Sequence, residues 1–143
     1  MLVSEDPAAR DVRFEVEGTA APVFADRELL KIVLLNLLLN AAQAVQHHGT
    51  IRTSVLASDR ACRIAVADDG PGIPAEIRDR VFAPFFTTKS RGTGLGLPTA
   101  KRLIDAHDGS ISVACPVEGG TIVTVELPRG VISEPSRRPS ARP

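Results

Sequence analysis

The stretch from Asp26 to about Gln46 constrains the fold of this chain most, because it predicts a long apolar helix. Its first residue suits an N-cap position, and Gly49 suits the stop. Apolar residues occupy nearly every side, so we expect the helix to be largely buried. Asn36, Asn40 and Gln43 nevertheless share one face, at i, i+4 and i+7. A buried amide without partners costs about 1–3 kcal/mol, so these side chains need either a neighbouring loop backbone or a ligand.

Five short stretches are predicted to be β-strands: residues 12–18, 50–56, 61–67, 110–115 and 121–127. In the third, Cys62, Ile64 and Val66 share a face, and the period of two places Asp68 on that same face. In the last strand the Thr121 hydroxyl points with the core residues. A sharp turn rich in Gly and Pro follows Asp68. The carboxylate therefore either caps that turn or is a buried acceptor for a ligand N–H, such as an exocyclic amine.

Residues 82–97, FAPFFTTKSRGTGLGL, hold three of the five Phe residues, one Lys and three Gly at alternate positions. This mixture predicts a mobile lid that is anchored by its Phe side chains and closes over the phosphates of a nucleotide. The glycines immediately precede a helix predicted over 97–107, and the N-terminus of a helix favours phosphate. We expect residues 87–93 to be poorly ordered without nucleotide, because few apolar groups there offset the ordering entropy.

Composition narrows the function classes. A length of 143 residues predicts one compact domain. Lys plus Arg and Asp plus Glu each total 17, so net charge indicates neither a nucleic-acid partner nor a membrane-surface contact. Leu29 to Ala42 comes nearest to a membrane span, but polar residues interrupt it. Cys62 and Cys115 fit no metal-ligand spacing and form no disulfide-dense framework, which favours a reduced, cytoplasmic setting. Both lie on apolar faces of predicted strands, so we expect two buried free thiols.

Four motifs, taken in order, resemble those of the catalytic ATP-binding domain of two-component sensor histidine kinases, in the Bergerat-fold (GHKL) superfamily. The N box is 36–44, the G1 box 68–72, the F box 82–86 and the G2 box 92–96. The resemblance covers about residues 11–128. The run PFFTTK before the G2 box looks most like the nitrogen-regulation and oxygen-sensing kinases.

The resemblance implies an α/β (α+β) two-layer sandwich, in which a mixed sheet of about five strands packs on three helices beside a mobile ATP lid. We assign residues 1–128 to this domain. Residues 129–143, rich in Pro, Ser and Arg, are predicted to be a disordered tail or linker.

ATP and Mg²⁺ are the implied cofactors. The resemblance assigns Asn40 to the metal, Asn36 to the phosphate side, Asp68 to the adenine amino group with support from Thr121, and Lys89 to the terminal phosphates. Asn36, Asn40 and Lys89 would be the catalytic residues. The implied nucleotide site comprises Asn36, Asn40, Gln43, Asp68, Gly70, Gly72, Ile73, Phe82, Lys89, Arg91, Gly92, Thr93, Gly94, Leu95, Gly96, Leu97 and Thr121.

Asn36 discriminates within the superfamily, because gyrase-type and mismatch-repair ATPases carry a general-base Glu there. An amide cannot deprotonate water, so transfer to a histidine is favoured over hydrolysis. Gln43 also departs from the basic residue of many sensor kinases. An ATPase or serine kinase of the same fold, and a nucleotide-binding module without catalysis, remain as alternatives.

No phosphoacceptor is assigned, because His47, His48 and His107 each end a predicted helix. The expected partners are therefore a histidine phosphoacceptor and dimerisation domain elsewhere in the full-length kinase, and a response regulator. The full-length kinase could be membrane-anchored, and we expect the excised domain to be a monomer without contact to nucleic acid or membrane.

Overall fold

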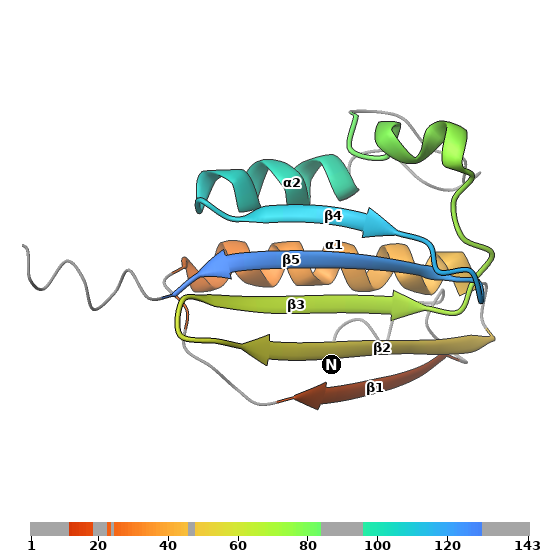
Figure 1. Ribbon diagram of the computed structural model, residues 1–143, viewed down its shortest axis with the longest axis horizontal. Coiled ribbons are helices and arrows are strands. Elements are labelled where there is room, and N and C mark those ends of the chain that lie inside the picture. The colour runs from red at the N-terminus through yellow and green to blue at the C-terminus, as the bar shows by residue number, and fades with distance from the viewer. Residues whose placement is uncertain (1–11, 19–22, 24, 46–47, 84–95, 130–143) are drawn as a thin grey trace, which may run out of the picture.

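The computed structural model describes residues 12–18, 23, 25–45, 48–83 and 96–129. In this part of the chain, five strands form one mixed sheet. Their spatial order is β1 (Val12–Gly18), β2 (Gly49–Ala57), β3 (Ala61–Asp68), β5 (Thr121–Pro128) and β4 (Ser110–Ala114), and β1–β2 is the parallel pair. Figure 1 shows the two long helices on one side of this sheet. The predicted two-layer α/β sandwich is therefore confirmed.

The elements follow the predicted order. They are β1 (Val12–Gly18), α1 (Arg27–Val45), β2 (Gly49–Ala57), β3 (Ala61–Asp68), η3 (Ala75–Arg80), α2 (Gly96–Ala106), β4 (Ser110–Ala114) and β5 (Thr121–Pro128). Each predicted strand and long helix agrees to within one or two residues. The third helix of the described residues, η3, is a short 3₁₀ segment.

The start of α1 is fixed by Asp26, whose carboxylate accepts the backbone N–H groups of Glu28 at 2.9 Å and Leu29 at 3.2 Å. This arrangement satisfies donors that the first turn of a helix leaves unpaired, as predicted for an N-cap. His107, just after α2, ties the two helices together. Its Nε2 accepts the Asp26 N–H at 3.1 Å, and its Nδ1 lies 2.8 Å from the Leu103 carbonyl oxygen.

The prediction that α1 is largely buried is wrong. The fully buried side chains form one stripe, and Ile32 on another face is 43% exposed. A two-layer domain has no third layer to cover the outer face of its helix. The buried residues of α1 are Val33, Leu37, Leu38, Ala41, Ala42 and Val45.

By length and composition alone, α1 is apolar enough to cross a membrane, despite the polar residues that interrupt it. Its buried stripe accounts for much of that apolar character, because Leu37 and Ala41 join the same core as Ile51 of β2 and Val125 of β5. A helix that packs against the core of a folded domain can therefore be as long and as apolar as a membrane-spanning helix.

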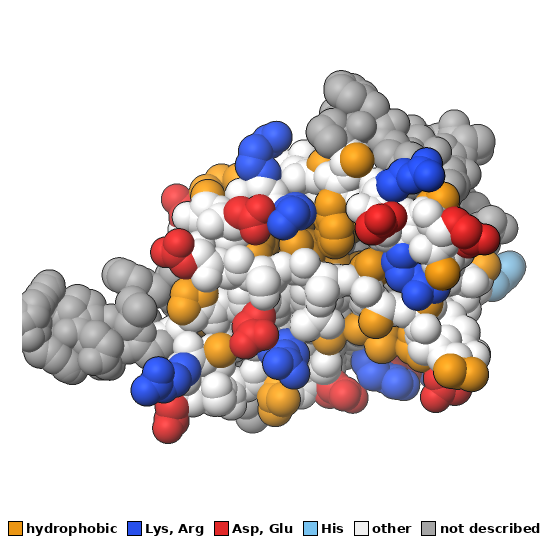
Figure 2. All heavy atoms as spheres, turned by 45° about the horizontal axis from the view of Figure 1, so that its top comes forward, with side chains coloured by type: hydrophobic (Ala, Val, Ile, Leu, Met, Phe, Trp, Pro, Cys, Tyr) orange, Lys and Arg blue, Asp and Glu red, His pale blue; other side chains and the backbone are white. Residues whose placement is uncertain are grey.

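Charged side chains do not gather by sign on the face shown in Figure 2, where basic and acidic groups are interspersed. Two of the ion pairs lie across neighbouring strands. Arg52 Nη2 lies 2.9 Å from Glu15 Oε1, and Arg63 Nη2 lies 3.5 Å from Glu126 Oε1. Exposed pairs of this kind contribute about 0–1 kcal/mol each, so the core dominates the stability of the fold.

Candidate nucleotide site

Several elements converge at one end of the sheet, on the right in Figure 1. They are the C-terminal end of β3, the first residue of β5, the C-terminal half of α1, the start of α2, and η3. The loop from Asp69 to Pro74 connects β3 to η3 at this end and contains Gly70 and Gly72. The G1-box residues therefore lie at the end of the sheet where α2 begins.

Asp68 is the last residue of β3 and is paired in register with Thr121, the first residue of β5. The two side chains share a face of the sheet with the core, because Val66 is 2% exposed and Thr121 is 4% exposed. The inward direction predicted for both residues from the period of two is thus confirmed.

The carboxylate of Asp68 also caps the turn that follows it. Asp68 Oδ1 accepts the Gly70 N–H at 2.9 Å. A carboxylate has about four acceptor positions, so this hydrogen bond does not by itself exclude a ligand donor. The two roles predicted for Asp68, as the cap of the turn and as an acceptor for a ligand N–H, are therefore compatible.

At Gly70 the loop passes so close to α1 that a side chain cannot be accommodated. A Cβ added to Gly70 would lie 2.8 Å from the Ala44 carbonyl oxygen of α1. Asp69, the second carboxylate of the G1 box, points elsewhere and accepts the Thr50 N–H at 3.1 Å. Asp68 is consequently the acidic residue of this pair that caps the loop, while Asp69 secures the start of β2.

Gly120, just before Thr121, lies close to the backbone of Asp68, so a side chain at this position should destabilise the fold. Its φ of +86° is unfavourable for other residues, and an added Cβ would collide with the Asp68 carbonyl group. We expect Gly120→Ala to lower the free energy of unfolding by about 2 kcal/mol or more, measured by urea denaturation.

The neighbouring Gly119 gives the matched control. Its φ is +111°, but an added Cβ would meet no atom within 4 Å. Gly119→Ala therefore carries backbone strain without the collision, and we expect it to cost less than Gly120→Ala. Equal losses in the two variants would contradict a close contact between Gly120 and Asp68.

The amide side chains of α1 lie partly in the site. Asn36 and Asn40 are half-buried, one turn apart, whereas Gln43 is exposed. A Cβ added to Gly96, the first residue of α2, would lie 4.0 Å from Asn36 Oδ1. The structure thus brings the N box next to the last glycine of the G2 box, as the predicted shared site requires.

The lid is only partly described. Phe82 is half-buried and packs against the core, and Leu97 is 7% exposed at the start of α2. The anchoring role predicted for Phe82 agrees with this packing. Phe85 and Phe86 lie outside the described residues, as does the predicted disorder of 87–93. The same holds for the site residues Lys89, Arg91, Gly92, Thr93, Gly94 and Leu95.

Two contributors near this site were not predicted from the sequence. Arg78 of η3 donates to the Ile73 carbonyl oxygen, and the thiol of Cys115 accepts the Ile73 N–H at 3.4 Å. Neither residue belongs to a motif box, so the sequence carried no signal for them.

The expectation of two buried thiols is correct for Cys62 and wrong for Cys115, which is half-buried. Burial raises the pKa of the Cys62 thiol, an effect partly offset by the positive charge of Arg129. Cys115 is more open because it follows the last residue of β4 and lies beside the loop, at the edge of the core.

The acidic, histidine and cysteine side chains of the described residues form no cluster of three or more that could hold a metal ion. Mg²⁺ commonly binds through one or two protein oxygens together with phosphates and water. The amide oxygen of Asn40, half-buried on the site face of α1, fits that mode of binding.

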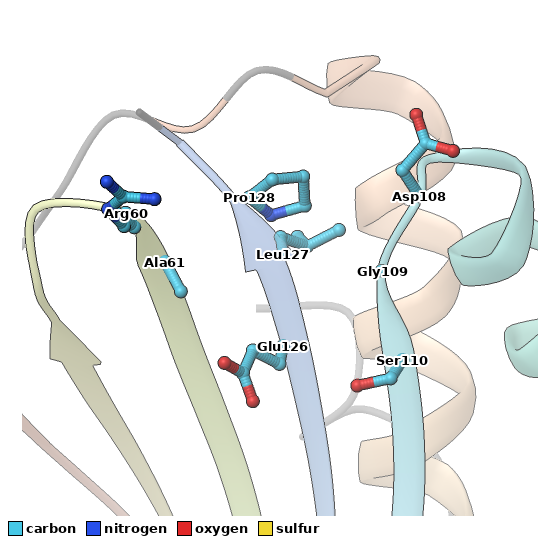
Figure 3. Close-up of a pocket in the computed structure, with 8 residues that line it drawn as sticks. All are labelled: Arg60, Ala61, Asp108, Gly109, Ser110, Glu126, Leu127 and Pro128. Atoms are coloured by element: carbon cyan, nitrogen blue, oxygen red, sulfur yellow. The ribbon is translucent and has the colours of Figure 1, made fainter. Parts of the chain in front are cut away.

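A shallow pocket of about 280 Å³ lies at the opposite end of the sheet (Figure 3). It is lined by Arg60, Ala61, Asp108, Gly109, Ser110, Glu126, Leu127 and Pro128. Ala61 and Asp68 are the two ends of β3, so this pocket is on the order of 20 Å from Asp68. It is a feature separate from the candidate nucleotide site.

The sequence model of a family described as histidine kinase-, DNA gyrase B-, and HSP90-like ATPase matches residues 25–131. The chain belongs to this ATPase family. The match contains the Asp68–Thr121 pair and the amide face of α1. The family membership inferred from the order of the motifs is therefore confirmed.

Similar proteins place this ATPase domain among the histidine kinases. The sensor histidine kinase ZraS of Escherichia coli (strain K12) is 42% identical over 129 residues, which cover 89% of this chain and 28% of ZraS. The catalytic domain of histidine kinase ThkA superposes with a TM-score of 0.80 at 35% identity, covering 90% of this chain and 86% of that chain.

Full-length ShkA in complex with AMPPNP superposes with a TM-score of 0.73 at 29% identity, covering 88% of this chain and 28% of that chain. The chain thus spans less than a third of the length of ZraS. It corresponds to the ATPase domain of such kinases.

Proposed function

We propose that this ATPase domain binds ATP with Mg²⁺ between the Asp68–Thr121 pair and the amide face of α1, and donates the γ-phosphate to a histidine of a separate domain. The observation that carries the proposal is the convergence of these groups at one end of the sheet. Asp68 and Thr121 are paired in register there, and Asn36 lies beside the first residue of α2.

The chemistry of the site supports transfer to a histidine rather than to water. Asn36 occupies the position at which hydrolytic members of the superfamily use a Glu, and an amide does not act as a general base. In the transfer, the unprotonated imidazole nitrogen forms a bond to the γ-phosphorus while the bond to the β-phosphate oxygen breaks and ADP leaves. Such a step depends mainly on positioning and charge neutralisation.

The nucleotide would occupy the site with its base towards Asp68 and its phosphates towards α2. Asp68 would accept the exocyclic amine, and Asn36 would contact the phosphates. Mg²⁺, when bound, would neutralise charge on the phosphates, with Asn40 as its protein ligand. The ATP analogue named for ShkA supports a nucleotide in a site of this fold.

The described histidines favour an acceptor elsewhere. Both ring nitrogens of His107 are engaged, one by the Asp26 N–H and the other at the Leu103 carbonyl oxygen. His48 is exposed just before β2, but it is followed by Gly49 and lacks the acidic neighbour that is typical of the acceptor histidine in this family. We therefore propose that the acceptor histidine belongs to the dimerisation domain of the full-length kinase, which in turn serves a response regulator.

The test is phosphate transfer from ATP labelled at the γ-phosphate to a fragment that carries the acceptor helix of the full-length kinase. We expect label on that fragment when the domain is present, and none when its acceptor histidine is replaced by Gln. Steady-state release of inorganic phosphate without labelling of the fragment would contradict the proposal and favour an ATPase. Binding of ATP without either reaction would favour a non-catalytic nucleotide-binding module.

A further inference from the structure

The peptide groups of Ile73, in the loop that follows the G1 box, are held by side chains from two other parts of the chain. Arg78 Nε and Nη2 donate to the Ile73 carbonyl oxygen at 3.2 Å and 2.8 Å. On the other side, Cys115 Sγ accepts the Ile73 N–H at 3.4 Å and lies 3.7 Å from the same carbonyl oxygen. Both the donor and the acceptor of this residue are therefore fixed.

The thiol of Cys115 also connects the loop to β5. Its Sγ lies 3.9 Å from the Thr121 hydroxyl oxygen, and Thr121 is the buried register partner of Asp68. Cys115 is thus in contact with the loop at Ile73 and with the strand that faces Asp68. A displacement of the thiol would disturb both sides of the proposed base site.

The loop needs such support because of its composition. Between β3 and η3, Pro71 and Pro74 lack backbone N–H groups, and Gly70 and Gly72 lose more conformational entropy on ordering than other residues. The contacts of Arg78 and Cys115 supply hydrogen bonds that a regular element would provide. They leave the Ile73 side chain half-buried, with apolar surface at the end of the sheet that holds Asp68.

We propose that Arg78 and Cys115 are positioning residues for the base end of the nucleotide, acting through Ile73. The inference rests on the proposed function, because it assumes that a nucleotide occupies this end of the sheet. The Arg78 guanidinium donates from two nitrogens to one carbonyl oxygen, and this arrangement depends on its planar geometry. A lysine ammonium therefore replaces it only in part. Preorganising the loop lowers the ordering cost that the nucleotide would otherwise meet on binding.

The test compares Arg78→Met and Cys115→Ala with the unmodified domain by calorimetric titration with ATP and with ADP. We expect each variant to lose about tenfold in affinity, equivalent to about 1.4 kcal/mol. The loss should be the same for the two nucleotides, because they share the base and differ only at the phosphate end. Arg102→Met, on the exposed face of α2, and Cys62→Ala, at the other end of β3, are the matched controls.

Hydrogen exchange at Ile73 distinguishes a role in positioning the loop from a general loss of stability. We expect the Ile73 amide to exchange with solvent faster in Cys115→Ala, while amides in the middle of β3 and β5 exchange as before. Arg78→Lys and Cys115→Ser each keep one hydrogen-bonding group, and we expect their affinities to lie between those of the unmodified domain and the larger substitutions. These two variants also serve if the larger substitutions do not fold.

The outcomes distinguish this inference from the proposed function. If the unmodified domain binds neither nucleotide, the proposed function fails and the inference fails with it. If the unmodified domain binds ATP and Asp68→Asn abolishes binding, while Arg78 and Cys115 variants bind as tightly as the unmodified domain, only the inference is overturned. A much larger loss for ATP than for ADP would also overturn it, since that pattern belongs to the phosphate end.

Discussion

Asp68→Asn is expected to weaken ATP binding by about 5- to 150-fold, because a donor that faces another donor is left unpaired at a cost of about 1–3 kcal/mol. The carboxylate accepts the Gly70 N–H through one oxygen, and an asparagine carbonyl can keep that bond. The amide NH₂ then takes the place of the second carboxylate oxygen and faces the exocyclic amine, which is itself a donor. The turn survives while recognition of the base is lost.

The measurement is calorimetric titration with ATP, accompanied by thermal unfolding. The thermal unfolding checks that Asp68→Asn is folded at the temperature of the titration. Asp69→Asn is the matched control, because this adjacent carboxylate accepts the Thr50 N–H at the start of β2. Equal ATP affinity in Asp68→Asn and the unmodified domain would remove Asp68 from the proposed site.

Local periodicity explains why so much of this site could be predicted. The direction of a side chain on a strand depends only on its parity, so Asp68 could be assigned to the face of Val66 without knowledge of the fold. The burial of Thr121 and its register with Asp68 confirm that assignment. Asn36 and Asn40 are one helical turn apart, and their shared face is likewise a local property.

Contacts between distant parts of the chain were not predictable in the same way. Ile73 and Cys115 are 42 positions apart, and their contact exists because β4 and the loop reach the same end of the sheet. The exposure of Ile32 on α1 has a similar origin. Hydrophobic periodicity shows which faces of a helix are apolar. How many of those faces are covered depends on the number of layers that pack together.

The second large effect is expected when Asn40 is replaced, and it concerns the dependence of ATP binding on Mg²⁺. We expect Mg²⁺ to strengthen ATP binding by the unmodified domain and to have almost no effect on Asn40→Ala. Loss of even an indirect metal partner costs about 10–100-fold in affinity, so loss of a direct oxygen ligand should cost at least as much. The measurement is ATP affinity with Mg²⁺ and with excess chelator, expressed as a ratio for each variant.

That ratio separates loss of a ligand from loss of structure. Alanine has a higher helix propensity than asparagine, so Asn40→Ala favours the helical state of α1. Asn40→Asp keeps a hard oxygen at the same position, and we expect it to retain a strong dependence on Mg²⁺. If Asn40→Ala and the unmodified domain show the same ratio, the metal is held without this side chain. The half-buried amide pair of α1 would then serve the phosphates or the packing of α1 against α2, and the assignment of Asn40 as a metal ligand would fall.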